Sequence, residues 1–286
     1  SIEIPAKAIT VISGVSGSGK SSLLHETIAR SVTQKKPVNC KNITGLEQFS
    51  GVLEMEQQAA NKTISSTPLT ITGLWQPLKQ IFIKHSEGPA NHVNLKTKES
   101  LCPECKGYGI IRISMDFLAD MEIPCESCKG LRYTNPVLKY RLSGKNLGEL
   151  LNMTVDEAIQ HLSCYPEYTG KLKVLSETGL GYLTLGQHGH HLSDGEWQRL
   201  KLISVLLQNK NTSKNLILLD EPSAGLHYKD AIKLYRLFEG LRDNNNTLII
   251  IEHHPLFTRL ADYNIVLGPG AGRDGGKLIH CGKARC

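Results

Sequence analysis

The chain has 286 residues, of which 40% are hydrophobic and 21% charged, and its formal net charge is +6. This length and apolar content suffice for one large core or two modest ones, so we expect a globular protein. The sequence contains no run as long as a membrane span and no basic-then-apolar secretory start, which predicts a soluble, cytoplasmic protein. The positive charge permits an acidic partner such as nucleic acid without requiring one.

The first motif lies near the start of the chain. A β-branched apolar run at 8–13 precedes GVSGSGKS at 14–21, and residues 22–31 have the apolar spacing of a helix. In this context the loop amides turn toward phosphate oxygens, Lys20 reaches the terminal phosphates and Ser21 ligates Mg²⁺. A glycine-rich strand-to-helix turn is the alternative, but the complete pattern favours a nucleotide site. Its predicted residues are Gly14, Ser16, Gly17, Ser18, Gly19, Lys20, Ser21 and Ser22.

Two later apolar runs end in acidic or basic side chains. The run at 216–219 is typical of a strand buried on both faces, and it leads into Asp220 and Glu221. We expect Asp220 to hold Mg²⁺ and Glu221 to activate the attacking water, although a strand ending in a polar turn before Pro222 would look the same. The run at 247–251 leads to His253, which taken alone indicates only a surface histidine.

The stretch HLSDGEWQRLKL at 191–202 predicts the start of a helix that has both an N-terminal cap and an anion-binding geometry. Ser193 and Glu196 are spaced as a capping box before an apolar helix face, so an ordinary amphipathic helix explains the pattern. The small Gly195 also leaves free N–H groups at a positive helix end, where anions bind. Asp194 places an acid among those N–H groups.

Two CxxC pairs lie between these motifs. Nineteen residues separate the second cysteine of one pair from the first of the next, a spacing that predicts a tetrahedral zinc site. Disulfides are the alternative, but a cytosolic protein disfavours them. Residues 111–123 alternate roughly between apolar and polar, which predicts a hairpin with its tip near 118–120. The predicted ligands are Cys102, Cys105, Cys125 and Cys128, whereas Cys40, Cys164, Cys281 and Cys286 show no ligand spacing.

The order of these motifs resembles that of an ABC-type ATPase, and the CxxC insert before the LSDGE helix resembles the C-terminal half of the UvrA family. Further matching segments include GKN at 144–146, MTVDEA at 153–158, LDEPSAGLH at 219–227 and LGPGAGRDGGK at 267–277. The resemblance implies ATP, Mg²⁺ and Zn²⁺ as cofactors. It also implies that Gln57 is the Q-loop residue, that Ser193 and Gly195 bind the γ-phosphate held by an opposing P-loop, and that His253 is the switch.

The same resemblance implies a second nucleotide-binding domain, either another half or another copy, because one copy does not complete an ATP site. Family function implies recognition of damaged double-stranded DNA in nucleotide excision repair, with handover to a UvrB-like protein through an N-terminal half absent here. The sequence departs from the family at LSDGE, where the family has LSGGE. It also departs at 62–68, where the family usually has two arginines and two prolines and this sequence has one basic residue and one proline. These departures, and a start at Ser1 rather than Met, allow either a fragment or a divergent paralogue.

We therefore predict an α/β ABC-type P-loop ATPase domain split by a signature domain that carries a zinc-bound β-hairpin. The ATP-binding lobe is expected at 1–72 and 212–286, the signature domain at 73–211, and the zinc module at about 98–135. The alternative function is a UvrA-like ATPase in drug resistance or in regulating a protein machine, with the zinc module as a docking surface. Neither function involves a membrane.

Overall fold

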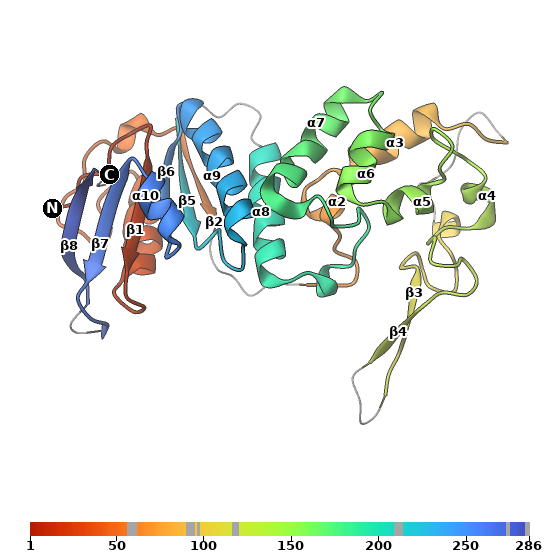
Figure 1. Ribbon diagram of the computed structural model, residues 1–286, viewed down its shortest axis with the longest axis horizontal. Coiled ribbons are helices and arrows are strands. Elements are labelled where there is room, and N and C mark those ends of the chain that lie inside the picture. Colours follow the sequence, from red (N-terminus) through yellow and green to blue (C-terminus); the bar gives the residue numbers. More distant parts are fainter. Residues whose placement is uncertain are drawn as a thin grey trace. The chain divides into compact units, whose positions relative to one another are not determined.

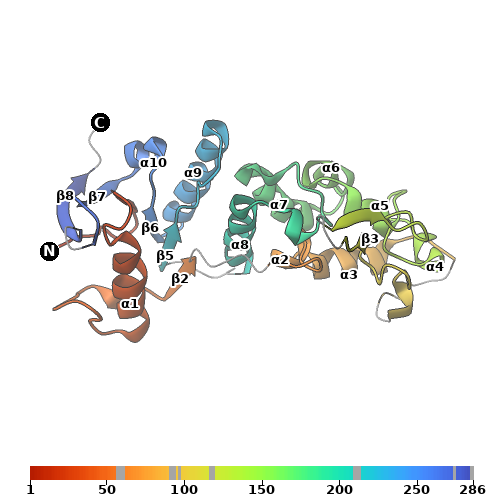
Figure 2. The same cartoon turned by 90° about the horizontal axis from the view of Figure 1, so that it is seen from below.

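The computed structural model describes residues 1–55, 62–89, 95, 98–115, 120–208, 214–272 and 275–283. Gln57, Cys286 and most of the expected hairpin tip lie outside these ranges. The chain forms two compact units, shown in Figures 1 and 2. The first contains Ser1–Ala60, Glu177–Gly179 and Gln208–Cys286, and the second contains Asn61–Ser176 and Leu180–Leu207.

The first unit is built on a six-stranded sheet in the order β2-β5-β6-β1-β7-β8. All pairs are parallel except β7 with β8, which is antiparallel. The carboxyl ends of β1, β5 and β6 therefore lie at one edge, where ligands bind in sheets of this kind. The strands are β1 (Ile9–Gly14), β2 (Gly51–Met55), β5 (Asn215–Asp220), β6 (Thr247–Ile251), β7 (Tyr263–Gly268) and β8 (Lys277–Lys283).

Helices cover this sheet because its central strands are apolar on both faces. Every residue of β5 and β6 is buried, as expected for strands covered on both sides. Leu24 and Ile28, on the helix after the P-loop, belong to the same buried cluster as Ile12 of β1. The helical segments of the unit are η1 (Ser22–Ala29), α1 (Arg30–Gln34), η2 (Leu46–Gln48), α9 (Tyr228–Asp243) and α10 (Pro255–Leu260).

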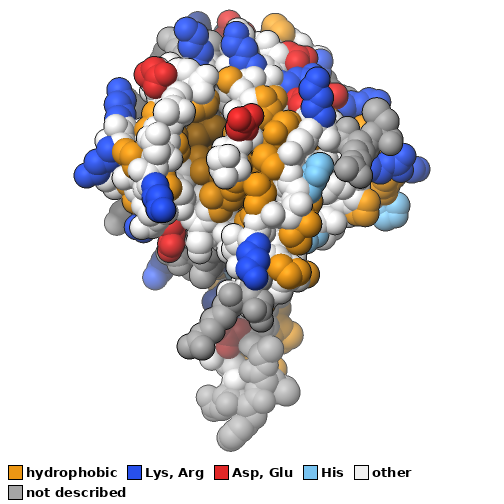
Figure 3. Space-filling model, turned by 90° about the vertical axis from the view of Figure 1, so that its left-hand side faces the viewer, with side chains coloured by type: hydrophobic (Ala, Val, Ile, Leu, Met, Phe, Trp, Pro, Cys, Tyr) orange, Lys and Arg blue, Asp and Glu red, His pale blue; other side chains and the backbone are white. Residues whose placement is uncertain are grey.

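The outer strand of the sheet keeps apolar side chains exposed. Leu278 and Ile279 of β8 are 40% and 56% exposed. Figure 3 views the side on which β8 is drawn in Figure 1 and shows hydrophobic side chains gathered there, with Lys and Arg around them. The antiparallel β8 thus ends the sheet without covering all of its apolar surface.

The second unit is mostly helical. The helices α5 and α6 begin with capping boxes, Asn146 with Glu149 and Thr154 with Glu157, which satisfy free N–H groups at both starts. The main helices are α2 (Pro68–Ile71), α3 (Trp75–His85), α4 (Asn135–Leu138), α5 (Leu147–Asn152), α6 (Val155–His161), α7 (Pro166–Leu175) and α8 (Asp194–Gln208). Shorter turns are η3 (Lys98–Ser100) and η5 (Gly189–His191), whereas η4 (Ser176–Leu180) contains Glu177–Gly179 of the first unit.

An antiparallel hairpin projects from this unit (Figure 1). Its strands are β3 (Ile110–Ile113) and β4 (Met121–Pro124), and Ile113 pairs with Met121. The alternation of apolar and polar residues in the sequence predicts these strands.

The predicted domain limits and the compact units differ mainly at the first boundary. The sequence places it at residue 72, whereas the second unit begins at Asn61. The segment that follows packs into the second unit because the carbonyl oxygen of Ser66 accepts a hydrogen bond from the Gly189 N–H at 2.7 Å. Within the described ranges, no helix is both long and apolar enough to cross a membrane.

Candidate ATP site, signature helix and metal centre

The P-loop connects the end of β1 to the start of η1. Gly14 has a φ of 145°, and a Cβ there would lie 2.1 Å from the carbonyl oxygen of Leu267, so only glycine fits. The Lys20 ammonium donates to the carbonyl oxygens of Gly14 at 3.1 Å and Val15 at 3.0 Å. Lys20 therefore lies over the loop whose amides would hold phosphate.

The turn between β7 and β8 supports the P-loop from outside. The N–H of Gly272 donates to the Gly17 carbonyl oxygen at 3.2 Å, and the N–H of Gly276 donates to that of Ser18 at 3.0 Å. These contacts explain why the glycine-rich segment after β7 accompanies a P-loop, a relation that its composition alone does not reveal.

The predicted Mg²⁺ ligands come together at the edge of the sheet. The Ser21 hydroxyl donates to Oδ2 of Asp220 at 3.1 Å, although the two residues are 199 positions apart in the sequence. A hydroxyl beside a carboxylate at the phosphate end of a P-loop is the donor set that holds Mg²⁺ with a nucleoside triphosphate. The residues present therefore fit the ion.

His25 is a further residue of this site that sequence reasoning missed. Its Nδ1 lies 2.5 Å from Oε1 of Glu54, and its Nε2 lies 3.4 Å from Oδ2 of Asp220. The hydrogen bond with Asp220, aided by Glu54, raises the pKa of His25 to about 9 despite its burial. A protonated His25 compensates the charge of both carboxylates. No signal in the sequence pairs these three positions, because they lie on separate elements.

Glu221 and His253 meet after the ends of β5 and β6. Oε1 of Glu221 lies 3.5 Å from Nε2 of His253, and the Glu221 N–H donates to the Ile251 carbonyl oxygen at 3.0 Å. Both side chains are partly exposed, at 37% and 49%. A carboxylate held beside an imidazole at this edge can orient water toward a phosphate.

A buried carboxylate organises the backbone around this pair. Glu252 is 2% exposed, and its oxygens accept hydrogen bonds from the N–H groups of Ser223 at 2.8 Å, His253 at 3.1 Å and His254 at 3.3 Å. It thus links the segment after Glu221 to the segment that carries His253. The sequence shows Glu252 only as the neighbour of a histidine and does not indicate this role.

The signature helix α8 begins with the expected capping box. Oε2 of Glu196 accepts from the Ser193 N–H at 2.7 Å, and the Glu196 N–H donates to the Ser193 hydroxyl at 3.3 Å. The Tyr182 hydroxyl also donates to Glu196. Burial opposes charge on Glu196, but these bonds, with Arg199 nearby, lower the pKa of its carboxyl.

Lys62 lies across the start of α8. Its Nζ is 2.6 Å from Oδ1 of Asp194 and donates to the Leu192 carbonyl oxygen at 2.6 Å. The Asp194 side chain is 87% exposed, so the acid points outward from the helix start. The one basic residue that the sequence keeps in 62–68 therefore pairs with the unusual acid of the signature.

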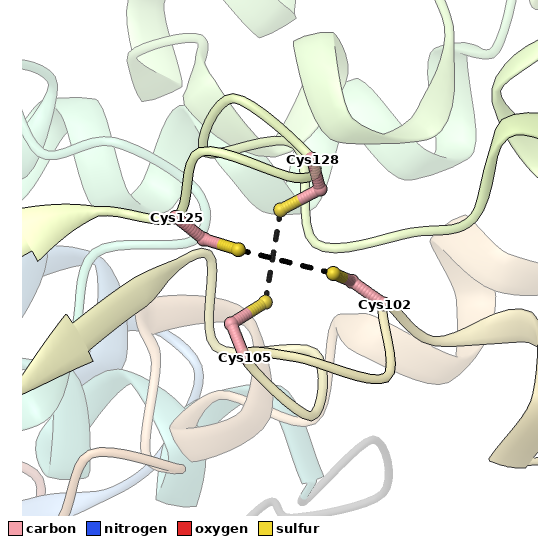
Figure 4. A group of neighbouring side chains, drawn as sticks. All are labelled: Cys102, Cys105, Cys125 and Cys128. Atoms are coloured by element: carbon pink, nitrogen blue, oxygen red, sulfur yellow. Dashed lines mark hydrogen bonds between the residues drawn. The ribbon is translucent and has the colours of Figure 1, made fainter.

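The four predicted zinc ligands converge on one point (Figure 4). Sγ of Cys102 lies 3.9 Å from that of Cys125, and Sγ of Cys105 lies 3.6 Å from that of Cys128. A tetrahedral zinc with bonds of about 2.3 Å separates its sulfurs by about 3.8 Å. A disulfide would need about 2.05 Å, so the geometry fits the metal and excludes the alternative.

The electrostatics of this cluster also suit a cation. Burial raises the pKa of Cys125 and raises that of Cys128 to about 12. Burial acts the same way on Cys102, but the N–H groups of Cys105 and Glu104 lower its pKa to about 7. Packed thiolates are therefore unfavourable unless a dication compensates them. Of the cysteines without ligand spacing, the described Cys40, Cys164 and Cys281 are free thiols.

The predicted site residues thus fall into separate groups. The first unit carries the P-loop, Asp220, Glu221 and His253, and the second carries Ser193, Gly195 and the cysteine cluster. Gln57 lies outside the described residues.

Comparison with known proteins identifies close relatives. UvrABC system protein A of Staphylococcus aureus is 39% identical over 98% of this chain and 31% of its own length. The Staphylococcus epidermidis protein is 38% identical over the same shares. UvrA2 from Deinococcus radiodurans matches in structure with a TM-score of 0.84 at 33% identity, covering 98% of this chain and 35% of its own. A search of protein-family models gave no match.

The chain spans about a third of the length of these relatives. The match extends over the sheet, the P-loop and the cysteine module, so the predicted ABC-type fold with its zinc-fitting insert is confirmed. By its sequence and by its fold, this chain is similar to UvrA proteins over about a third of their length.

Proposed function

We propose that this chain binds and hydrolyses ATP with Mg²⁺ at the P-loop edge of its sheet. The observation that carries the proposal is the meeting of Ser21 with Asp220, with Glu221 and His253 at the ends of neighbouring strands. In this proposal Lys20 and the loop amides hold the phosphates, Ser21 and Asp220 hold Mg²⁺, and Glu221 activates water. His253 faces the γ-phosphate region in this proposal, and Gln57, which lies outside the described residues, keeps the Q-loop role that the family resemblance implies.

We infer that hydrolysis also needs the signature helix of a second nucleotide-binding domain. Ser193 and Gly195 lie at the positive start of α8, where backbone N–H groups can donate hydrogen bonds to an anion. A second copy of the chain, or another half of a longer protein, would supply this helix to the P-loop. The ATP lobe at 1–72 and 212–286, split by the signature domain, is the arrangement that such pairing uses.

Similarity to UvrA proteins supports damaged double-stranded DNA as the ligand and nucleotide excision repair as the process. The net charge of +6 favours an anionic partner. The hairpin exposes Ile113, Met115 and Met121, and apolar side chains of this kind insert between base steps of distorted duplexes. A UvrB-like protein would bind through sequence beyond this chain, and the cytoplasm would be the compartment.

The same exposed hairpin side chains favour a second function, in which the zinc module docks on a protein. A UvrA-like ATPase that acts in drug resistance, or that regulates a protein machine, would then bind a protein surface instead of DNA. Exposed apolar groups serve either role, so the salt dependence of binding separates them.

The test measures binding of the zinc-loaded chain to intact duplex and to duplex with one bulky adduct, over a salt series, with and without ATP. For a DNA sensor, the logarithm of the binding constant falls with the logarithm of the salt concentration, with a slope of about −0.9 for each phosphate contact. Such a sensor also binds the adduct duplex more tightly than the intact duplex. Met121→Ser in the hairpin should reduce the adduct preference, whereas Leu278→Ser in β8 should leave it unchanged. Weak binding with neither a salt slope nor an adduct preference would contradict the DNA function.

A further inference from the structure

A second group of metal-ligating side chains lies outside the cysteine cluster. Glu122 is on β4 of the hairpin, and His190 and His191 are in η5, just before the signature helix. Nε2 of His190 lies 2.7 Å from Oε1 of Glu122, and Nε2 of His191 lies 2.8 Å from Oε2. One ligand atom from each residue falls within 4.8 Å of the others.

These short contacts are not hydrogen bonds. Among the described residues, neither ring nitrogen of His190 nor Oε2 of Glu122 has a hydrogen-bond partner, although all three atoms are buried. A ring N–H that served Glu122 would point along the line joining the two atoms. The in-plane direction of the His190 nitrogen therefore misses the Glu122 oxygen, although the two atoms are close.

Charge alone does not explain the cluster. Nε and Nη2 of Arg112 already donate to Oε1 of Glu122, at 3.2 and 2.8 Å. Two protonated imidazoles with ring centroids 4.1 Å apart would repel each other and Arg112 around this single carboxylate. Imidazoles that hold an ion through their lone pairs avoid that repulsion.

Glu122 is suited to serve as the anionic ligand. Burial opposes its charge, but the hydrogen bonds from Arg112 lower the pKa of its carboxyl, so the group is ionised. Arg112 holds Oε1, which leaves Oε2 available on the side of His191. An outer partner that fixes one carboxylate oxygen is typical of metal ligands.

The spacing permits an ion after a small opening. Bonds of about 2.0–2.1 Å in a tetrahedron separate N and O ligands by about 3.3 Å, some 0.6 Å more than the present contacts. The His191 side chain is 51% exposed and can rotate outward, whereas His190 and Glu122 are 20% and 16% exposed. His188 is not a ligand, because its nitrogens lie 2.6 Å from the Ile64 and 2.9 Å from the Tyr108 carbonyl oxygen.

We propose that Glu122, His190 and His191 form a second metal site, which binds a divalent first-row transition ion such as Zn²⁺, Co²⁺ or Ni²⁺. Two imidazoles and one carboxylate suit these ions and leave a position for water. The ion would join the hairpin to the segment two residues before Ser193, so its binding fixes β4 against the start of α8.

The test titrates Ni²⁺ into the full chain already loaded with one zinc at the cysteine cluster, followed by calorimetry and by metal analysis after gel filtration. The wild type should bind one further ion. The double variant His190→Ala/His191→Ala should lose that ion, and Glu122→Gln, which keeps the shape of the side chain, should weaken it by about tenfold or more. The matched control His85→Ala/His280→Ala removes two histidines elsewhere and should bind as the wild type does.

Zinc content and far-ultraviolet circular dichroism establish that each variant is folded. If the double variant does not fold, the Ni²⁺ affinity of the Glu122→Gln protein tests the proposal alone. Hydrogen exchange in β4 should slow when Ni²⁺ binds the wild type and stay unchanged in Glu122→Gln. The proposal is overturned if the wild type holds only the zinc of the cysteine cluster, or if the further ion binds Glu122→Gln as tightly as the wild type.

Discussion

The ammonium of Lys62 lies 2.6 Å from the carboxylate of Asp194 at the start of the signature helix. This pair matters because the phosphate of an opposing P-loop would approach the same N–H groups. At about 10 Å and an effective dielectric of about 20, two like unit charges repel by roughly 1.7 kcal/mol before salt screening. Lys62 offsets part of the charge that Asp194 brings to this position.

The first prediction is that Asp194→Gly strengthens ATP-dependent association of the chain by up to about tenfold, because ~1.4 kcal/mol corresponds to that factor. The variant removes the repelling acid and leaves Lys62 for the phosphate. Lys62→Ala should weaken association, since Asp194 then stands uncompensated. Sedimentation of these proteins in a Glu221→Gln background, at two salt concentrations, measures both effects.

The gain from Asp194→Gly should be larger at low salt. Thermal stability without nucleotide should fall slightly, because an acid in the first turn favours the helix dipole by about 0.3–1 kcal/mol. Glu167→Gly, which removes an acid from the first turn of α7, is the matched control and should not change association. Equal or weaker association of the Asp194→Gly protein would show that the acid does not face the phosphate.

The second prediction concerns the cysteine cluster. Cys105→Ala should reduce zinc to well below one ion per chain and unfold the hairpin before the ATP lobe, because the ligands anchor only the insert. Metal analysis and hydrogen exchange in β3 and β4 measure these effects, while nucleotide binding shows whether the ATP lobe is still folded. Cys164→Ala, at an exposed free thiol, should leave all three unchanged. Wild-type protein purified without chelator but lacking zinc would rule out the site.

The third prediction is a pH dependence at the capping box. The folded-state pKa of Glu196 is lowered, so its charge contributes stability above the ordinary value of 4.5, and that contribution is lost as the pH falls through the lower folded value. Glu196→Gln keeps an acceptor for the Ser193 N–H but removes the charge. The difference in thermal midpoint between the wild type and the variant should therefore shrink on acidification. A difference that stays constant from pH 7 to pH 3 would refute the role of the charge.

Local patterns predict much of this molecule. Residues 247–251 form β6 as expected, because the four consecutive apolar residues after Thr247 are typical of a strand buried on both faces. Two other features are also short-range, so their spacing in the sequence reveals them. They are the capping box of Ser193 and Glu196 and the two CxxC pairs of the cysteine cluster.

Contacts between distant segments could not be predicted in this way. Lys62 and Asp194, His25 and Asp220, and Glu122 and His190 meet only after the chain has folded. Each pair consists of common surface residue types without a fixed sequence separation. The helix starts and strand ends that bring them together were predictable, but the pairing depends on packing between elements.

The most direct test of the central claim compares ATP binding and hydrolysis by the wild type and Glu221→Gln over a range of protein concentrations. The Ser21–Asp220 contact and the phosphate loop are intact in the variant, so it should bind Mg²⁺-ATP as tightly as the wild type. Hydrolysis should fall by about a hundredfold or more because the base is lost, whereas wild-type activity per chain should rise with concentration as copies pair. Hydrolysis by Glu221→Gln at a rate similar to the wild type would contradict the assignment of the site.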